Sequence, residues 1–351
     1  MRFGLILQDP DQPKKMSEIH LNQGGYSNAF ELRLGGDVTD YFSWTADFNA
    51  VLDGDGAGTS TGGGTFADFS IEDLIAQFKA AKEFQIWAGR LLVPSDRSNF
   101  SGPFFTSPWN YPGFYKAGAA PIGPMEGPNG RNQGVTVWGN AADDKFKYYA
   151  GVYGIDQGGP TFEGNGTGAN PFYSARLSYT FQGSEPGYFG SSTYYGDKSV
   201  VTLGVGAQYM KDGSVDPTST AMVKPQKDTV IGMADLLAEE ATDAGTFTFE
   251  GQFYAFNSGY QFSGPTQPYS PKEAFYALFS YLTPQNIGVG KLQPLIRWQQ
   301  TADPAWTVVD VALAYVMKAY DCRLVLNYEH TDLGSDGGVA NALEFGVQLQ
   351  K

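Results

Sequence analysis

Only one cysteine, Cys322, and two histidines, His20 and His330, occur among the 351 residues. A single cysteine excludes an internal disulfide framework, and two histidines leave little material for a metal site or a catalytic triad. We therefore predict no metal, no cofactor and no enzymatic activity. Strand pairing is expected to stabilise the fold.

Long apolar runs are also missing. The longest stretches free of both charge and polarity, such as residues 311–317, are far shorter than the roughly 20 apolar residues that a membrane-spanning helix requires. Basic residues are scarce too, since 23 Lys and Arg stand against 37 Asp and Glu, for a formal net charge of −14. Because such a chain repels phosphates, we predict no nucleic-acid partner.

The acidic pairs do not indicate a catalytic or calcium site. Glu239 with Glu240, and Asp143 with Asp144, fall at expected turns, where paired carboxylates are usually solvated. Residues 53–56 (DGDG) lack the downstream carboxylate of an EF-hand. The first residues also lack the pattern of a secretory signal, so we expect a mature or recombinant chain.

Alternation of apolar and polar residues is the main feature present. In residues 41–52, Phe42, Trp44 and Phe48 share one parity, and Asp47 and Asn49 share the other. A period of two is typical of a strand whose faces meet different solvents. The pattern recurs in sixteen segments: residues 2–8, 28–36, 41–52, 70–80, 84–93, 133–141, 145–153, 171–182, 199–210, 227–239, 245–256, 272–283, 290–300, 305–317, 320–330 and 339–350.

The connections alternate between tight turns and long loops. Turns are predicted at 36–40, 80–83, 141–144 and 318–321, and loops rich in Gly, Ser, Pro and Asp at 9–27, 53–69, 94–132, 154–170, 211–226 and 257–271. Residues 183–198 are long on the turn side, and residues 301–304 are short on the loop side. Arg90 shares the face of Phe84 and Ile86, which suggests a bulge or a misplaced boundary.

An even number of strands, each about 9 to 11 residues long, suits a barrel in a membrane. We predict an all-β, 16-stranded antiparallel transmembrane β-barrel, a single domain over residues 1–351 with short periplasmic turns and long extracellular loops. A soluble β-sandwich is the alternative. Its weakness is that aromatic residues occupy the predicted outward face.

Charges fall on the predicted inner face. In residues 171–182, Tyr173, Leu177 and Phe181 alternate with Ser174 and Arg176. A charge facing lipid costs about 2 to 4 kcal/mol near mid-membrane, which explains this segregation. The predicted charges of the pore wall are Arg33, Asp47, Lys147, Arg176, Glu250 and Arg297.

The connection at residues 94–132 is the longest and contains six aromatic residues within residues 104–115. A long aromatic loop has apolar surface to bury, and the interior of a barrel offers the place. We predict that it folds into the lumen and narrows it, with an outward lid or a partner-binding loop as the alternative. The predicted constriction residues are Asp96, Arg97, Trp109, Lys116, Glu126 and Arg131.

Several short runs carry a resemblance. Residues 29–36 (AFELRLGG), 44–48 (WTADF) and 86–94 (IWAGRLLVP) resemble the opening hairpins of the phosphate-selective porin O/P family, and residues 249–254, 293–298 and 323–330 resemble its closing strands. The resemblance implies a 16-stranded, commonly homotrimeric outer-membrane porin. The chain departs from that family's arginine ladder and lysine cluster, and its acidic and basic candidates nearly balance, so we expect weak selectivity.

We therefore predict an outer-membrane porin of a Gram-negative-type bacterium, which passes ions and small hydrophilic solutes by diffusion. Its expected partners are the lipid bilayer, its solutes and further copies of the chain in a homotrimer. One alternative is a barrel sleeve that docks another outer-membrane protein, such as a cytochrome. Another is an adhesin with its determinants in loops 53–69 and 154–170.

Overall fold

The computed structural model describes residues 2–7, 19–21, 29–52, 66–102, 104–110, 130–154, 170–215, 226–256, 272–302, 306–332, 334 and 338–351. Its strands are β1 (Arg2–Leu7), β2 (Ile19–Leu21), β3 (Ala29–Asp37), β4 (Phe42–Leu52), β5 (Phe66–Ala81), β6 (Phe84–Leu92), β7 (Arg131–Ala141), β8 (Phe146–Tyr153), β9 (Phe172–Gln182), β10 (Val200–Val215), β11 (Gln226–Thr242), β12 (Gly245–Phe256), β13 (Glu273–Leu282), β14 (Lys291–Ala302), β15 (Trp306–Lys318), β16 (Cys322–Asp332) and β17 (Val339–Leu349). The single helix within these ranges is α1 (Arg97–Ser101). None of the described helical residues forms a segment long and apolar enough to span a bilayer.

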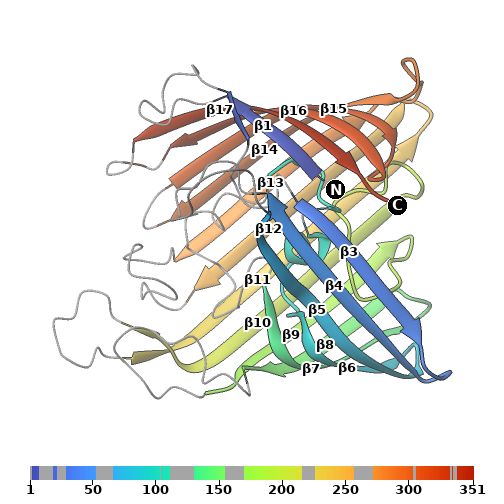
Figure 1. Cartoon of the computed structure of the whole chain (residues 1–351), viewed down its shortest axis with the longest axis vertical. Helices are drawn as coiled ribbons and strands as arrows, with labels where there is room; N and C mark the ends of the chain where they lie inside the picture. The colour runs from blue at the N-terminus through green and yellow to red at the C-terminus, as the bar shows by residue number, and fades with distance from the viewer. Residues whose placement is uncertain are drawn as a thin grey trace.

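All strands belong to one antiparallel sheet, as predicted. From β3 to β17 each strand pairs with the next along the chain, and β1 pairs with β17 from Arg2 to Leu7. β1 also meets β3 through the pair Arg2 and Ala29. Strands from the beginning and the end of the chain therefore lie side by side, and the sheet curves around an interior (Figure 1). The short β2, which pairs with β1, lies within the predicted loop 9–27.

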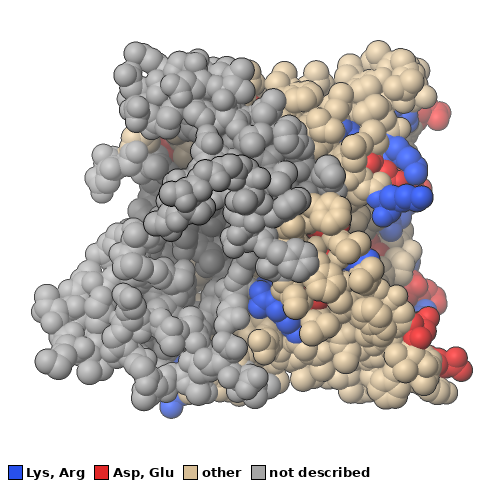
Figure 2. Space-filling model, viewed as in Figure 1, with Lys and Arg blue, Asp and Glu red and all other residues tan. Residues whose placement is uncertain are grey.

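The described turns lie at one end of the sheet, together with both ends of the chain (Figure 1). They occupy residues 38–41, 82–83, 142–145, 243–244, 283–290 and 319–321, close to the predicted positions. The predicted loops at 9–27, 53–69, 154–170, 211–226 and 257–271 lie mostly outside the described residues. On the face shown in Figure 2, acidic and basic side chains of the described residues gather towards the turn end.

The two faces of the strands differ as the alternation predicts. In β12, Phe247 and Phe249 are each 41% exposed, whereas Thr248 and Glu250 between and beside them are each 1% exposed. β9 repeats this along its length, with exposed Tyr173 next to buried Ser174. An outward apolar face and an inward polar face follow from the period of two in the strand.

The bulge suggested near Arg90 is wrong in its position. Arg90 pairs with Leu74 in regular register and remains on the outward face, where its Nε donates a hydrogen bond to the Ile71 carbonyl at 3.1 Å. The register shift lies instead between β4 and β5, where Asp47 pairs with Asp73 but Phe48 pairs with Ile71. Glu72 is the extra residue, so Glu72 and Asp73 are both buried although they are consecutive.

The interior contains apolar clusters in addition to polar side chains. One cluster joins inward residues of β11–β16 with Trp109, and the other joins inward residues of β5–β10 with Phe100 and Tyr188. Phe100, Trp109 and Tyr188 do not belong to strands. Connecting segments therefore enter the interior and pack there.

Replacing Phe249, in the middle of the outward face of β12, with Arg should lower the free energy of unfolding by about 2 to 4 kcal/mol, because a charge would face lipid. Phe249→Leu is the control and should cost less than about 1.5 kcal/mol. Denaturant unfolding in lipid vesicles measures both. An arginine variant as stable as the parent would contradict the assignment of this face to lipid.

Candidate functional site

The residues after β6 turn into the interior and begin α1. The Asp96 side chain caps the helix by accepting a hydrogen bond from the Asn99 backbone N–H at 3.0 Å. Asn99 Nδ2 donates to the Val93 carbonyl and to Ser95 Oγ, at 3.2 and 2.6 Å. These local bonds hold the start of the predicted constriction loop in a compact inward turn.

This segment is bonded to the inner wall around β9–β13. Ser98 Oγ lies 2.5 Å from the Tyr276 hydroxyl and accepts from Gln252 Nε2 at 2.8 Å. The Ser95 carbonyl accepts from Arg176 Nη1 at 2.7 Å. Its backbone polar groups are thereby satisfied by inward side chains of the strands.

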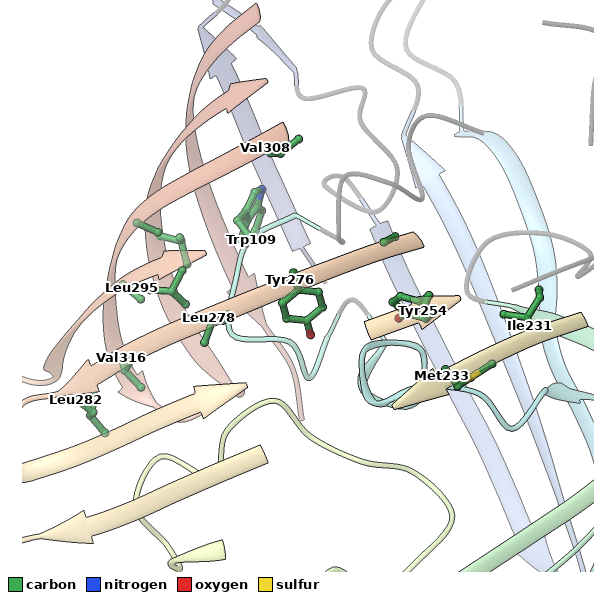
Figure 3. Close-up of a cluster of buried hydrophobic side chains, with 14 of the residues drawn as sticks. Trp109, Ile231, Met233, Tyr254, Tyr276, Leu278, Leu282, Leu295, Val308 and Val316 are labelled. Carbon is green, nitrogen blue, oxygen red and sulfur yellow. The ribbon is translucent and has the colours of Figure 1, made fainter. Parts of the chain in front are cut away.

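Residues 104–110 reach the adjoining part of the wall, on β14–β17. The Trp109 side chain is 1% exposed and packs in a cluster with Tyr276, Leu295 and Val308 (Figure 3). A Cβ on Gly346 of β17 would lie 2.5 Å from the Trp109 ring, so only glycine permits this contact. Arg323 donates to the carbonyls of Thr106 and Ser107 at 2.8 and 2.9 Å, and Asn110 Nδ2 donates to Glu344 at 2.5 Å.

A second segment, residues 183–199, enters the interior from the turn end. The Tyr188 ring stacks on Trp87 with centroids 4.3 Å apart, and its hydroxyl donates to the Leu92 carbonyl at 2.7 Å. Thr193 Oγ1 donates to Glu239 at 2.5 Å, and Ser192 Oγ donates to Glu250. The long connection expected on the turn side is thus an internal segment.

The two segments meet at an ion pair between Arg97 and Glu185. Arg97 Nη1 and Nη2 donate to the two carboxylate oxygens of Glu185 at 2.8 and 2.7 Å, and both side chains are buried. Burial raises the pKa of Glu185, but the charge and hydrogen bonds of Arg97 lower it more, so the pKa lies well below its ordinary value. Phe100 and Tyr188 extend the contact, with ring centroids 5.5 Å apart. Two segments that enter from opposite ends of the sheet therefore meet in the interior.

The six predicted wall residues lie on inner faces, and all of them have polar partners. Arg176 pairs with Asp235 at 2.8 Å, Arg297 with Asp310 at 2.9 Å and Arg33 with Asp47 at 2.9 Å. Glu250 accepts from the Tyr276 hydroxyl at 2.5 Å, and Lys147 Nζ donates to the Gly187 carbonyl at 3.5 Å. The cationic side chains of this set do not form one ladder, because each lies against a carboxylate or a carbonyl.

Four of the predicted constriction residues are described. Asp96, Arg97 and Trp109 come together on the internal segment, and Arg131 lies at the start of β7, where it pairs with Asp73 at 2.9 Å. Lys116 and Glu126 lie outside the described residues. The structure thus uses Asp96 as a helix cap and Trp109 as an anchor, and it does not leave them as exposed rim groups.

Sequence reasoning missed several interior residues. Glu239 was interpreted as a solvated turn carboxylate, which is wrong, because β11 continues to Thr242 and Glu239 is 1% exposed. The sequence did contain a signal for burial, because Glu239 lies on the same face of an alternating strand as Asp235 and Leu237. Glu185, Tyr188 and Arg323 were also not assigned to the site, although Arg323 shares its parity with buried Val325.

A cavity of about 290 Å³ remains beside the internal segments. One side of it is lined by inward residues of β3–β5 and β7, namely Glu31, Arg33, Asn49, Glu72 and Arg131. The other side is lined by residues of the two segments, among them Phe104, Phe105 and Phe189. No group of His, Cys, Asp and Glu within the described ranges has the arrangement of a metal site.

No protein-family model matches the chain, and no curated protein sequence matches it. Many solved structures are similar in fold, including the following three. Pseudomonas putida OprB, solved at high pH, has a TM-score of 0.61 at 10% identity, with 99% of this chain and 91% of that chain covered. Salmonella typhi OmpF in complex with daunomycin has a TM-score of 0.59 at 10% identity, with 100% of this chain and 97% of that chain covered. The outer-membrane channel DcaP of Acinetobacter baumannii has a TM-score of 0.54 at 9% identity, with 99% of this chain and 94% of that chain covered.

At this identity the likeness shows the fold alone. These neighbours are outer-membrane β-barrel proteins of Gram-negative bacteria, and the likeness of fold agrees with the predicted outer-membrane localisation. The general porin fold is supported. The narrower resemblance to the phosphate-selective porin O/P family stays a prediction, because no family model matches.

Gly346→Ala should lower the free energy of unfolding by about 1 to 3 kcal/mol, because the added methyl group would overlap the buried Trp109 ring. Gly232→Ala is the matched control, since a Cβ there meets nothing within 4 Å. Denaturant unfolding in lipid vesicles checks both. Equal stability of the two variants would count against the contact.

Glu185→Gln should cost up to about 3 to 5 kcal/mol at neutral pH, because it removes the nearer of the two carboxylates beside the buried Arg97 and leaves only Asp235, at 3.8 Å. The folded-state pKa of Glu185 is depressed, so the contribution of the charge is complete above the unfolded-state pKa of about 4.3 and decreases as the pH falls below it. The difference from the parent should therefore shrink on acidification from pH 7 to pH 3. Glu240→Gln, at an exposed neighbour of Glu239, is the control and should change stability by less than about 0.5 kcal/mol.

Proposed function

We propose that the protein is an outer-membrane porin that passes ions and small hydrophilic solutes through a closed barrel. In the proposed barrel, β1 and β3–β17 form a ring of sixteen strands, with β1 between β17 and β3. The pairings of β1 with both neighbours support this closure. A free edge facing lipid would leave backbone groups without hydrogen-bond partners, which the bilayer does not tolerate.

The observation that carries the proposal is the position of the described residues 93–102 and 104–110. They lie inside the curved sheet, bonded to Arg176 and Tyr276 on one side and to Arg323 and Glu344 on another. A segment held across a lumen narrows it, and the charges beside it influence which solutes pass. We assign the constriction to this segment together with residues 183–199.

The predicted residues then have distinct roles. Asp96 shapes α1, Arg97 joins the two internal segments through Glu185, and Trp109 anchors the first segment on β17. Arg131 lies in the wall of the remaining cavity. Lys116 and Glu126 remain proposed rim charges, and a homotrimer remains the proposed assembly, as the family resemblance implies.

The occupied interior also bears on the sleeve alternative. A barrel that houses another protein needs an empty lumen, whereas here two segments of the chain itself fill much of the described interior. Both segments are held by buried hydrogen bonds and by the ion pair of Arg97 and Glu185. This arrangement favours a narrowed pore over a sleeve.

Planar-bilayer recording of the purified protein tests the proposal, with stepwise ohmic conductance as the expected result. Trp109→Ala should give larger or noisier steps, because it loosens the anchor of the internal segment. Trp298→Ala, on the outward face where Trp298 is 43% exposed, is the matched control and should leave conductance unchanged. A silent parent protein would refute a conducting pore, and equal steps in all three proteins would refute the role of the segment.

A further inference from the structure

The lining of the cavity beside the internal segments holds two carboxylates, Glu31 and Glu72, and two guanidinium groups, Arg33 and Arg131. Two further carboxylates, Asp47 and Asp73, lie behind the lining against these arginines. Arg33 contacts two carboxylates, Asp47 at 2.5 Å and Glu31 at 3.2 Å. Arg131 likewise lies beside Asp73 at 2.9 Å and Glu72 at 3.6 Å. Each guanidinium group is thus shared between two carboxylates.

The bulge in β5 is responsible for half of this arrangement. In a regular strand Glu72 and Asp73 would point to opposite faces, and one of them would meet lipid. The extra residue turns both side chains inward, 4% and 1% exposed, towards Arg131. Four carboxylates therefore lie against two guanidinium groups on this wall.

A second observation points to a cation as the solute. Asn49 lines the cavity and is 3% exposed. Its Nδ2 donates to Glu72 Oε1 at 3.4 Å, whereas its Oδ1 has no hydrogen-bond partner among the described residues. A carbonyl oxygen next to a carboxylate offers acceptors to a cation or to a donor group, and it repels an anion.

The wider interior has the same sign. Among the described charged residues that are buried, ten are acidic and six are basic. Among the described buried residues, acidic groups therefore outnumber basic ones. An excess of one sign along a narrow path between low-dielectric walls concentrates the opposite ion.

We propose that the cavity lined by Glu31, Arg33, Asn49, Glu72 and Arg131 is the open part of the channel and that it passes cations in preference to anions. The inference rests on the proposed porin function and specifies its solute class. Phe104, Phe105 and Phe189 form the side opposite the charged wall and limit its width. The carboxylates on one side of this aperture attract cations and repel anions.

Reversal potentials in a KCl gradient across a planar bilayer test the inference. The parent protein should favour K⁺ over Cl⁻ by about tenfold, the order of local enrichment expected for an acidic cleft. The double variant Glu31→Gln/Glu72→Gln keeps the size of both side chains and removes both carboxyl groups from the cavity lining. Its ratio should fall towards one.

Glu83→Gln is the matched control, because Glu83 lies exposed in the turn between β5 and β6, away from the cavity. Its ratio should equal that of the parent. Conducting steps with a ratio of one or below would overturn the inference while leaving the pore intact. A ratio above one that the double variant does not change would overturn the assignment to this cavity, and absent steps would overturn the porin function itself.

Discussion

The whole structure depends on the need of each backbone amide and carbonyl for a hydrogen-bond partner where water is absent. A sheet meets that need only if every strand has neighbours on both edges. Consecutive strands pair from β3 to β17, and β1 pairs with both β17 and β3, which in the proposed barrel leaves no free edge. One face of each strand meets lipid in that barrel, so side chains sort by parity and charged groups have only the interior available.

Inside the sheet, the arrangement resembles a protein core as much as a water-filled bore. Apolar clusters around Trp109 and Tyr188 alternate with paired charges such as Arg176 with Asp235. The pairs explain how so many charges can be buried, because an isolated buried charge is far more costly than a hydrogen-bonded pair. The excess of acidic over basic groups gives a negative electrostatic potential along the proposed open cavity.

The sequence alone predicted those features that depend only on residues adjacent in the chain. Parity placed Arg176, Glu250 and Arg297 inside, because side chains alternate in every strand regardless of its partners. It could not predict that Arg176 pairs with Asp235, since that contact depends on the register of β9, β10 and β11. The bulge at Glu72 breaks the local rule, and the inward course of residues 183–199 depends on contacts with distant strands. Glu239 was misplaced because the end of β11 was set three residues too early.

The contact between Trp109 and Gly346 joins positions far apart in the chain and has a consequence for the order of assembly. The surface that receives the indole ring does not exist until β17, the final strand, has docked beside β16 and β1. Contacts between remote positions form late, because the entropy of closing the intervening chain must be overcome first. The internal segment therefore reaches its final seat at the end of folding, after the wall around it is complete. During folding, the interior of the barrel would therefore be wider until the internal segment packs into it.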